Sequence, residues 1–231
     1  AISSISTTDG SSERSYNAPL VWRQAGSTLK PFVYLLGIEE RKFTASSLLP
    51  DTADSIPNKF RAYEPKNFNH KFNGPVRVRN ALASSLNVPA VYALSLTGPR
   101  KSFDFTTQFG IKTSESIDDL GAGFVLGNRK IRLLDLASAY SNLARTGLVI
   151  PPIFSENTVL RPKRIVSKES VKMITDILAD NEARSSSFRR HSSLHIKDHR
   201  AAVKTGTSSS YRDAWTVGYD KNYTVAVWFG N

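Results

Sequence analysis

The most constraining feature of this sequence is a change of hydrophobic period close to residue 200. Before it, apolar residues recur at helical spacing, and the segments that predict helices are 27–40, 76–84, 89–96, 101–109, 133–145 and 168–179. After it, residues 201–207, 213–219 and 223–229 alternate or are rich in β-branched and aromatic side chains, which is typical of strands. Residues 220–222 predict a tight turn, and no βαβ alternation occurs. We therefore expect an α+β domain in which helices flank an antiparallel sheet.

Two polar segments lack a clear period. Residues 1–18 are rich in Ser, Thr and Asn and predict an N-terminal loop or extension, which leaves residues 19–231 for one folded domain. Residues 48–74 combine Pro, Asn, Asp and aromatic residues and predict a long irregular connection. With 40% hydrophobic residues among 231, the chain has enough apolar surface for a core, but its apolar stretches fall far short of the roughly 20 residues of a membrane helix.

The charge and the missing cysteines exclude several kinds of site. The formal net charge of +11 attracts polyanions, but the basic residues are spread out and are not interleaved with aromatic residues, so we expect no nucleic-acid partner. A chain without cysteine has no disulfide scaffold, thiolate zinc site or cysteine nucleophile. His191, His195 and His199 recur at helical spacing, but the surrounding Ser-rich stretch predicts a loop, so we expect no metal there.

Ser27 and Lys30 begin the first predicted helix and point to nucleophilic chemistry. Residues three apart lie on one helix face, so we expect the Lys30 amine to reach the Ser27 hydroxyl. Lysine acts as a base only when neutral, and lowering its pKa from about 10.4 to about 7 costs roughly 4 to 5 kcal/mol. Burial, a second cation at Lys204 and the helix dipole all act in that direction. The alternative is an N-cap serine followed by a snorkelling lysine.

Ser85 and Asn87 lie where a predicted helix breaks before Pro89, a place that presents polar side chains to a cleft. In the functional interpretation, the Ser85 hydroxyl relays a proton between the lysines and a leaving amine. The Asn87 amide orients the substrate peptide bond, because asparagine cannot act as a base. The alternative is ordinary turn chemistry of Ser and Asn.

Lys204, Thr205, Gly206 and Thr207 lie on a predicted strand, and the glycine leaves room for the backbone of a ligand. An extended peptide would pair there, with its terminal carboxylate at Lys204 and at the two threonine hydroxyls. The backbone N–H groups of Ser27 and Thr207 would form an oxyanion hole, in which one donor typically contributes about 3 to 4 kcal/mol. The alternative is an edge strand protected from aggregation by its lysine.

Residues 27–30, 85–87 and 204–206 together match the S-x-x-K, S-x-N and K-T-G motifs of serine acyl-enzymes that recognise penicillin. Over residues 17–230 the sequence resembles the transpeptidase domain of class A penicillin-binding proteins, most closely the 1C type. The stretches that resemble this family are 24–32, 74–76, 81–91, 133–140, 204–208 and 212–215.

The resemblance implies a peptidoglycan D,D-transpeptidase that cross-links stem peptides through an acyl-serine at Ser27, and β-lactams would acylate the same serine. It implies no metal or organic cofactor. It also implies a periplasmic or extracytoplasmic location at the bacterial inner membrane, with a tether in an N-terminal segment outside this sequence. In that family, sheet strands precede the nucleophile and a helix follows the last strand. Residues 1–18 are too polar for such strands and the sequence ends at Asn231, so we expect those parts to be missing.

Two other functions fit the same motifs. One is hydrolysis on the same scaffold, by a D,D-carboxypeptidase or a β-lactamase, in which water replaces the acceptor amine. Class A β-lactamases have S-D-N and a deacylating glutamate, whereas Leu86 occupies the middle of the second motif and no glutamate loop is evident, which favours slow deacylation. The other is a non-catalytic penicillin-sensing or cationic wall-binding module.

Overall fold

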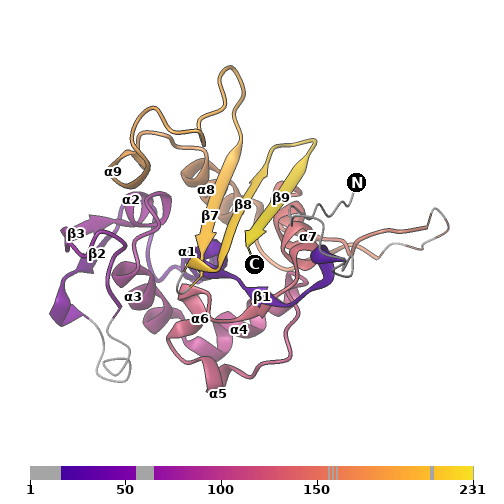
Figure 1. Ribbon diagram of the computed structural model, residues 1–231, viewed down its shortest axis with the longest axis horizontal. Helices are drawn as coiled ribbons and strands as arrows, with labels where there is room; N and C mark the ends of the chain where they lie inside the picture. Colours follow the sequence, from indigo (N-terminus) through magenta and orange to yellow (C-terminus); the bar gives the residue numbers. More distant parts are fainter. Residues whose placement is uncertain are drawn as a thin grey trace, which may run out of the picture.

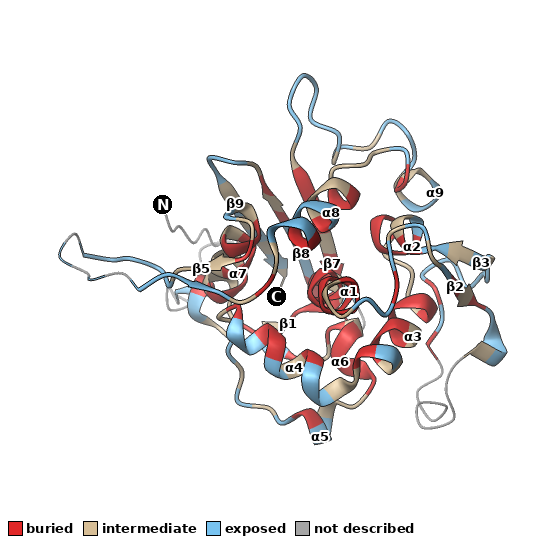
Figure 2. Ribbon diagram, turned by 180° about the vertical axis from the view of Figure 1, so that it is seen from behind, coloured by how far each residue is buried: buried red, intermediate tan, exposed pale blue. Residues whose placement is uncertain are grey.

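The predicted C-terminal meander is present. The computed structural model describes residues 17–55, 65–155, 157, 159, 161–208 and 211–230. In this part, the main sheet is antiparallel and has three strands, β7 (Ala202–Thr207), β8 (Asp213–Tyr219) and β9 (Thr224–Gly230), in the order β7-β8-β9. Helices lie behind this sheet in Figure 1 and in front of it in Figure 2, so they cover one of its faces. The α+β class is confirmed.

The described helices are α1 (Lys30–Glu39), α2 (Val78–Ala83), α3 (Val88–Thr97), α4 (Pro99–Gln108), α5 (Ile117–Leu120), α6 (Gly123–Leu126), α7 (Leu133–Ala144), α8 (Lys168–Leu178) and α9 (Ser185–Phe188). Local sequence explains several of their ends. Prolines stand in the first turns of α3 and α4, where the missing N–H costs no helix hydrogen bond. Ser167 caps α8 by accepting a hydrogen bond from the Ser170 N–H at 3.2 Å. Gly98, at φ 84°, lets the chain pass directly from α3 to α4.

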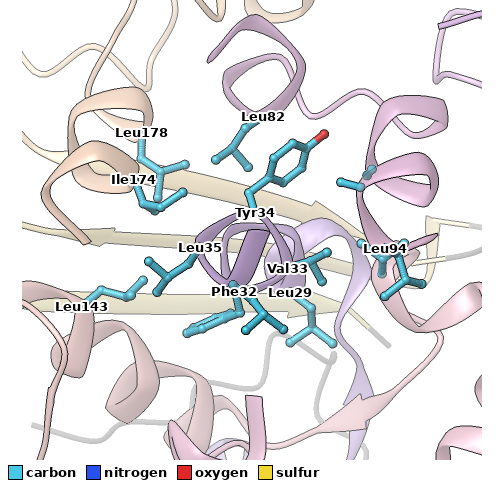
Figure 3. Packing of buried hydrophobic residues seen from close by; sticks show 14 of the residues in the cluster. Leu29, Phe32, Val33, Tyr34, Leu35, Leu82, Leu94, Leu143, Ile174 and Leu178 are labelled. Atoms are coloured by element: carbon cyan, nitrogen blue, oxygen red, sulfur yellow. The ribbon is translucent and has the colours of Figure 1, made fainter. Parts of the chain in front are cut away.

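Helix α1 forms the centre of the core and is apolar on all sides. Every residue from Lys30 to Ile38 is buried. In Figure 3 its side chains, among them Phe32 and Leu35, point in different directions toward residues of the surrounding elements. A surface helix would keep one polar side, whereas a helix that is apolar all round is enclosed. The enclosure of α1 also places the side chain of Lys30, its first residue, inside the protein.

The prediction of an irregular connection over residues 48–74 was wrong at both ends. Strand β2 (Leu48–Asp51) pairs antiparallel with β3 (Gly74–Arg77), and Pro50 stands opposite Pro75. Proline lacks the N–H that a strand donates, so the composition of these segments hides their pairing. Two further pairs are β1 (Arg23–Gln24) with β4 (Lys130–Ile131) and β5 (Leu148–Val149) with β6 (Lys163–Arg164).

Two predicted helix starts were also wrong. The first helix does not begin at Ser27, because residues Gly26–Leu29 form a separate 3₁₀ turn and α1 begins at Lys30. The second begins at Val78 rather than residue 76, because β3 extends to Arg77. The Ser-rich stretch for which we expected a loop contains the short helix α9, whereas His191, His195 and His199 lie beyond it in turns and irregular backbone. The prediction for residues 1–18 falls almost entirely outside the described residues.

None of the described helices is both long enough and apolar enough to span a bilayer.

Candidate active site

The turn that holds Ser27 is fixed by close backbone contacts with two other segments. The N–H groups of Ala25 and Gly26 donate to the carbonyls of Arg129 and Gly127, at 3.0 and 3.1 Å. Gly26 has φ 54°, and a Cβ on it would lie 2.5 Å from the backbone nitrogen of Thr207. A side chain at position 26 would therefore push β7 away. Ser27 itself is half-buried, so part of its surface stays accessible to solvent.

Lys30 is fully buried, and its amine has two short hydrogen bonds. The Nζ atom donates to the Ser85 carbonyl at 2.6 Å and to Asn87 Oδ1 at 2.7 Å, and it lies 3.5 Å from Ser85 Oγ. A neutral amine has two N–H bonds, so these acceptors use both and leave its lone pair free. Among the described residues, the hydrogen-bond partners of Lys30 Nζ are Ser85 and Asn87 and do not include the Ser27 hydroxyl.

Burial lowers the pKa of Lys30 well below its ordinary value, and the nearby Lys204 cation lowers it further. These are two of the causes that the sequence pattern predicted. The result is an amine that loses its proton at a much lower pH than an exposed lysine does. This is the condition for a lysine to act as a general base.

Ser85 joins the two lysines. It lies between α2 and α3 in a left-handed conformation, at φ 59°, which turns the chain sharply. Its hydroxyl accepts a hydrogen bond from Lys204 Nζ at 2.8 Å and stands within 3.5 Å of Lys30 Nζ. One hydroxyl thus has an amine on either side, as a proton relay requires.

Lys204 is 3% exposed and lies on β7, the strand at one edge of the described sheet. Its amine donates to Ser85 Oγ and, at 2.7 Å, to the carbonyl of Thr205. Burial, with the Arg184 cation as a second cause, lowers the pKa of Lys204 to about 7. The side chain is therefore close to half protonated at neutral pH, and a ligand carboxylate beside it would favour the charged form.

Among the described strands, β7 pairs with β8 alone, so the other edge of β7 has no strand partner there. Ser208 N–H donates to the Asp213 carbonyl, so in this antiparallel pair the even-numbered residues of β7 bond to β8 and the groups of Thr205 and Thr207 point to the open side. A Cβ on Gly206 would lie 3.2 Å from the Ser27 nitrogen. The backbone nitrogens of Ser27 and Thr207, predicted as oxyanion donors, therefore lie at one junction.

The structure brings Ser27, Lys30, Ser85, Asn87 and residues 204–207 to this junction, although they come from distant parts of the sequence. It also shows contacts that sequence reasoning missed. Asn87 N–H donates to Asn67 Oδ1 at 2.9 Å, and the Tyr140 hydroxyl donates to the Thr28 carbonyl at 2.7 Å. No local pattern marks these residues, because each takes part through a partner far away in sequence.

Two exposed aromatic side chains meet beside the site. Phe68 is one residue from Asn67, and Tyr211 lies in the loop that follows β7; they are 78% and 73% exposed. Their rings are in edge contact, with centroids 6.0 Å apart and planes at 89°. This ring contact links the segment of Asn67, which hydrogen-bonds Asn87, to the segment that follows Thr207.

Comparison with known proteins identifies the family of this chain. Residues 7–230 match the family model described as the penicillin binding protein transpeptidase domain. The chain belongs to this family. The transpeptidase-domain chain is 34% identical over 214 residues to penicillin-binding protein 1C of Escherichia coli, covering 90% of this chain and 26% of that protein. It is 30% identical to penicillin-binding protein 1F of Bacillus subtilis, covering 94% of this chain and 31% of that protein. The resemblance seen in the sequence is confirmed.

Solved structures agree on the fold. Penicillin-binding protein 1A of Haemophilus influenzae superposes with a TM-score of 0.78 at 24% identity, over 93% of this chain and 39% of that one. The PonA1 protein of Mycobacterium tuberculosis, solved in complex with penicillin V, superposes with a TM-score of 0.76 at 25% identity, over 94% of this chain and 62% of that one. The transpeptidase-domain chain spans about a quarter to a third of the length of the curated relatives it matches, from 26% to 31%.

Proposed function

We propose that this transpeptidase domain is a serine acyltransferase that cross-links peptidoglycan stem peptides ending in D-alanyl-D-alanine and that β-lactams acylate at the same serine. The observation that supports this most strongly is the lysine pair around one hydroxyl. Ser85 Oγ lies 2.8 Å from Lys204 Nζ and 3.5 Å from Lys30 Nζ, and both amines are buried. Neither a surface lysine pair nor a binding module needs amines with lowered pKa values.

Acylation would begin with the neutral Lys30 amine. Its two N–H groups are bonded to the Ser85 carbonyl and Asn87 Oδ1, so its lone pair takes the proton from the Ser27 hydroxyl. Ser27 Oγ then attacks the carbonyl carbon of the penultimate D-alanine. The oxyanion that forms would be held by the N–H groups of Ser27 and Thr207.

The leaving group needs a proton, and Ser85 is placed to deliver it. The proton on Lys30 passes through the Ser85 hydroxyl to the nitrogen of the terminal D-alanine, the C–N bond breaks, and an ester on Ser27 remains. The amine of a second stem peptide attacks this ester, gives its proton back along the same route and restores Ser27. With a β-lactam, the amide nitrogen stays joined to the acyl group, so the ester persists.

Substrate binding would use the open edge of β7. An extended peptide adds to a sheet edge through backbone hydrogen bonds, and Thr205 and Thr207 point their backbone groups to that side. Lys204 and the two threonine hydroxyls would hold the terminal carboxylate, with Gly206 leaving space for the ligand backbone and Asn87 orienting the scissile peptide. Because the substrate is the cell wall, we place the reaction on the extracytoplasmic side.

The test is a turnover assay with a donor peptide ending in D-alanyl-D-alanine and an acceptor amine, analysed by mass spectrometry. The proposal predicts release of D-alanine and a product in which donor and acceptor are joined. Release of D-alanine without a joined product would indicate a carboxypeptidase, and loss of a penicillin adduct within seconds would indicate a β-lactamase. Stable penicillin acylation with no peptide turnover would indicate a sensing module.

A further inference from the structure

Asp51 is a buried carboxylate that has no part in the reaction described above. The residue is 0% exposed and ends strand β2, which lies beside α3 in Figure 1. Its oxygens accept hydrogen bonds from the side chain of Asn67, at 2.8 and 2.9 Å, and from the backbone and side chain of Asn73, at 3.1 and 2.6 Å. A buried carboxylate is stable only where such donors replace its water shell, so Asp51 holds these two asparagines in place.

Asn67 uses both ends of its amide. The residue is 3% exposed. Its Nδ2 group donates to Asp51 and, at 2.8 Å, to the carbonyl of Lys71, while its Oδ1 accepts the Asn87 N–H at 2.9 Å. An amide whose donors and acceptor are all occupied has one favourable orientation, because a flip would set like groups against each other.

Asn87 connects Asn67 to the amine of Lys30. With its backbone N–H held by Asn67, its Nδ2 donates to the Lys66 carbonyl at 2.7 Å and its Oδ1 accepts from Lys30 Nζ at 2.7 Å. The carbonyl next to Asn67 and the side chain of Asn67 therefore hold Asn87 at two points. A continuous set of hydrogen bonds runs from the buried Asp51 to the amine of Lys30.

We propose that Asn67, anchored by Asp51, is a positioning residue for acyl transfer: it fixes Asn87 so that the lone pair of Lys30 faces the Ser27 hydroxyl. This inference rests on the proposed function. Asn67 touches neither substrate nor the reacting atoms in this account. Its effect is on the rate of the chemical step, because a small misplacement of a reacting group is enough to slow it strongly.

Asn73 provides a matched control. It donates to the same oxygen of Asp51 as Asn67 does, but within the described chain it makes no hydrogen bond to Asn87. Asn67→Ala and Asn73→Ala both remove a donor from Asp51, and only the first removes the support of Asn87. Acylation by a fluorescent penicillin, followed by rapid quench at several concentrations, separates the binding constant from the acylation rate constant. Thermal melting shows whether each variant is folded.

The inference predicts that Asn67→Ala lowers the acylation rate constant about 10- to 100-fold while binding changes little. Asn73→Ala keeps a rate constant within about threefold of the wild type, even if its melting temperature falls as far. Equal rate losses in the two variants, in step with their melting temperatures, would overturn the inference. A rate constant within about threefold for a folded Asn67→Ala would overturn it as well.

If Asn67→Ala does not fold, moving the carboxylate from position 51 to position 67 tests the same inference. Asn67→Asp keeps the oxygen that accepts the Asn87 N–H but places a carboxylate against Asp51, and we expect a slow chemical step. Adding Asp51→Asn restores a donor–acceptor pair in the opposite sense, and the double variant should regain at least half of the lost rate on a logarithmic scale. No recovery in a folded double variant contradicts the inference. Wild-type protein that penicillin does not acylate would contradict the proposed function itself, which separates the two failures.

Discussion

Two buried groups of basic side chains in this protein differ in whether they keep their charge at neutral pH. Lys30 and Lys204 are 0% and 3% exposed, and Arg129 is 1% exposed. Burial lowers the pKa of all three, yet it brings Lys204 to about 7 and Arg129 only to about 10, so the guanidinium keeps its charge at neutral pH. Burying an amine produces a base, whereas burying a guanidinium produces a fixed cation.

The partners of the two regions follow this difference. Arg129 lies over the Phe103 ring at 4.1 Å and donates to Thr106 Oγ1 and to the Ile111 carbonyl, at 2.5 and 2.8 Å. Its own carbonyl accepts the N–H of Ala25, so it supports the segment that leads to Ser27. The two lysines instead lie on either side of the Ser85 hydroxyl, which is placed to relay a proton between them. Arg129 thus supports the backbone that leads to Ser27, whereas the lysine pair is the region to which we assign the proton transfers.

The largest effect is expected at Lys30. Lys30→Met removes the base and should lower penicillin acylation about 10³-fold or more. Lys30→Arg keeps a cation of similar length but cannot release its proton, so it should be about as slow, which distinguishes a base from a structural charge. The measurement is the rate of covalent labelling by a fluorescent penicillin. Wild-type speed in the arginine variant would remove Lys30 from the role of base.

The pH dependence of acylation is a second test of Lys30 as the base. Because the pKa of Lys30 is well below its ordinary value, the fraction of neutral amine grows as the pH rises through that lowered pKa. The acylation rate should therefore rise with pH and reach its plateau at a lower pH than the titration of an exposed lysine would give. Rate constants measured across the range in which the protein stays folded test this. A rate that does not change with pH would contradict a titrating base.

Lys204 should couple stability to pH. Its pKa is about 7 in the folded protein against 10.5 for a free lysine, so between these values the unfolded chain holds a proton that the folded one lacks. Stability rises with pH in that window, by on the order of 5 kcal/mol for this group. Denaturant unfolding from pH 7 to 10 should show a steeper rise for the wild type than for Lys204→Met. Equal slopes would mean that Lys204 is charged throughout.

A smaller effect is expected at Arg129. Arg129→Met leaves the Ile111 carbonyl and two threonine hydroxyls without a donor, at a cost of about 1 to 3 kcal/mol in the free energy of unfolding. Arg129→Lys should recover only part of it, because an ammonium lacks the planar fork. Denaturant melts provide the measurement. A methionine variant as stable as the wild type would show that the guanidinium does not hold this region.

The smallest effect is expected at the surface. Arg79 forms ion pairs with Asp176 and Asp180 at 2.6 and 2.8 Å, but its side chain is 33% exposed. Arg79→Met should change stability by about 1 kcal/mol or less and leave acylation unchanged. A loss of acylation in this variant would show that the reaction also depends on a surface cation.

The sequence predicted the periodic parts of this protein and missed the parts that depend on contacts between distant segments. The meander, the central helix and the three motifs follow from local patterns. The β2–β3 pair was missed because each strand contains a proline, and the 3₁₀ turn at Ser27 was missed because its geometry is set by Gly127 and Thr207. The same limit hid Asn67 and Asp51, whose hydrogen bonds reach residues 16 to 22 positions away.

In the proposed reaction, Ser27 becomes a covalent acyl carrier beside a neutral amine. Intact mass spectrometry after exposure to a β-lactam, followed by peptide mapping, tests it most directly. We expect one adduct per chain, located on Ser27 and absent from a folded Ser27→Ala variant. An adduct on another residue, or none on a folded wild-type chain, would contradict it.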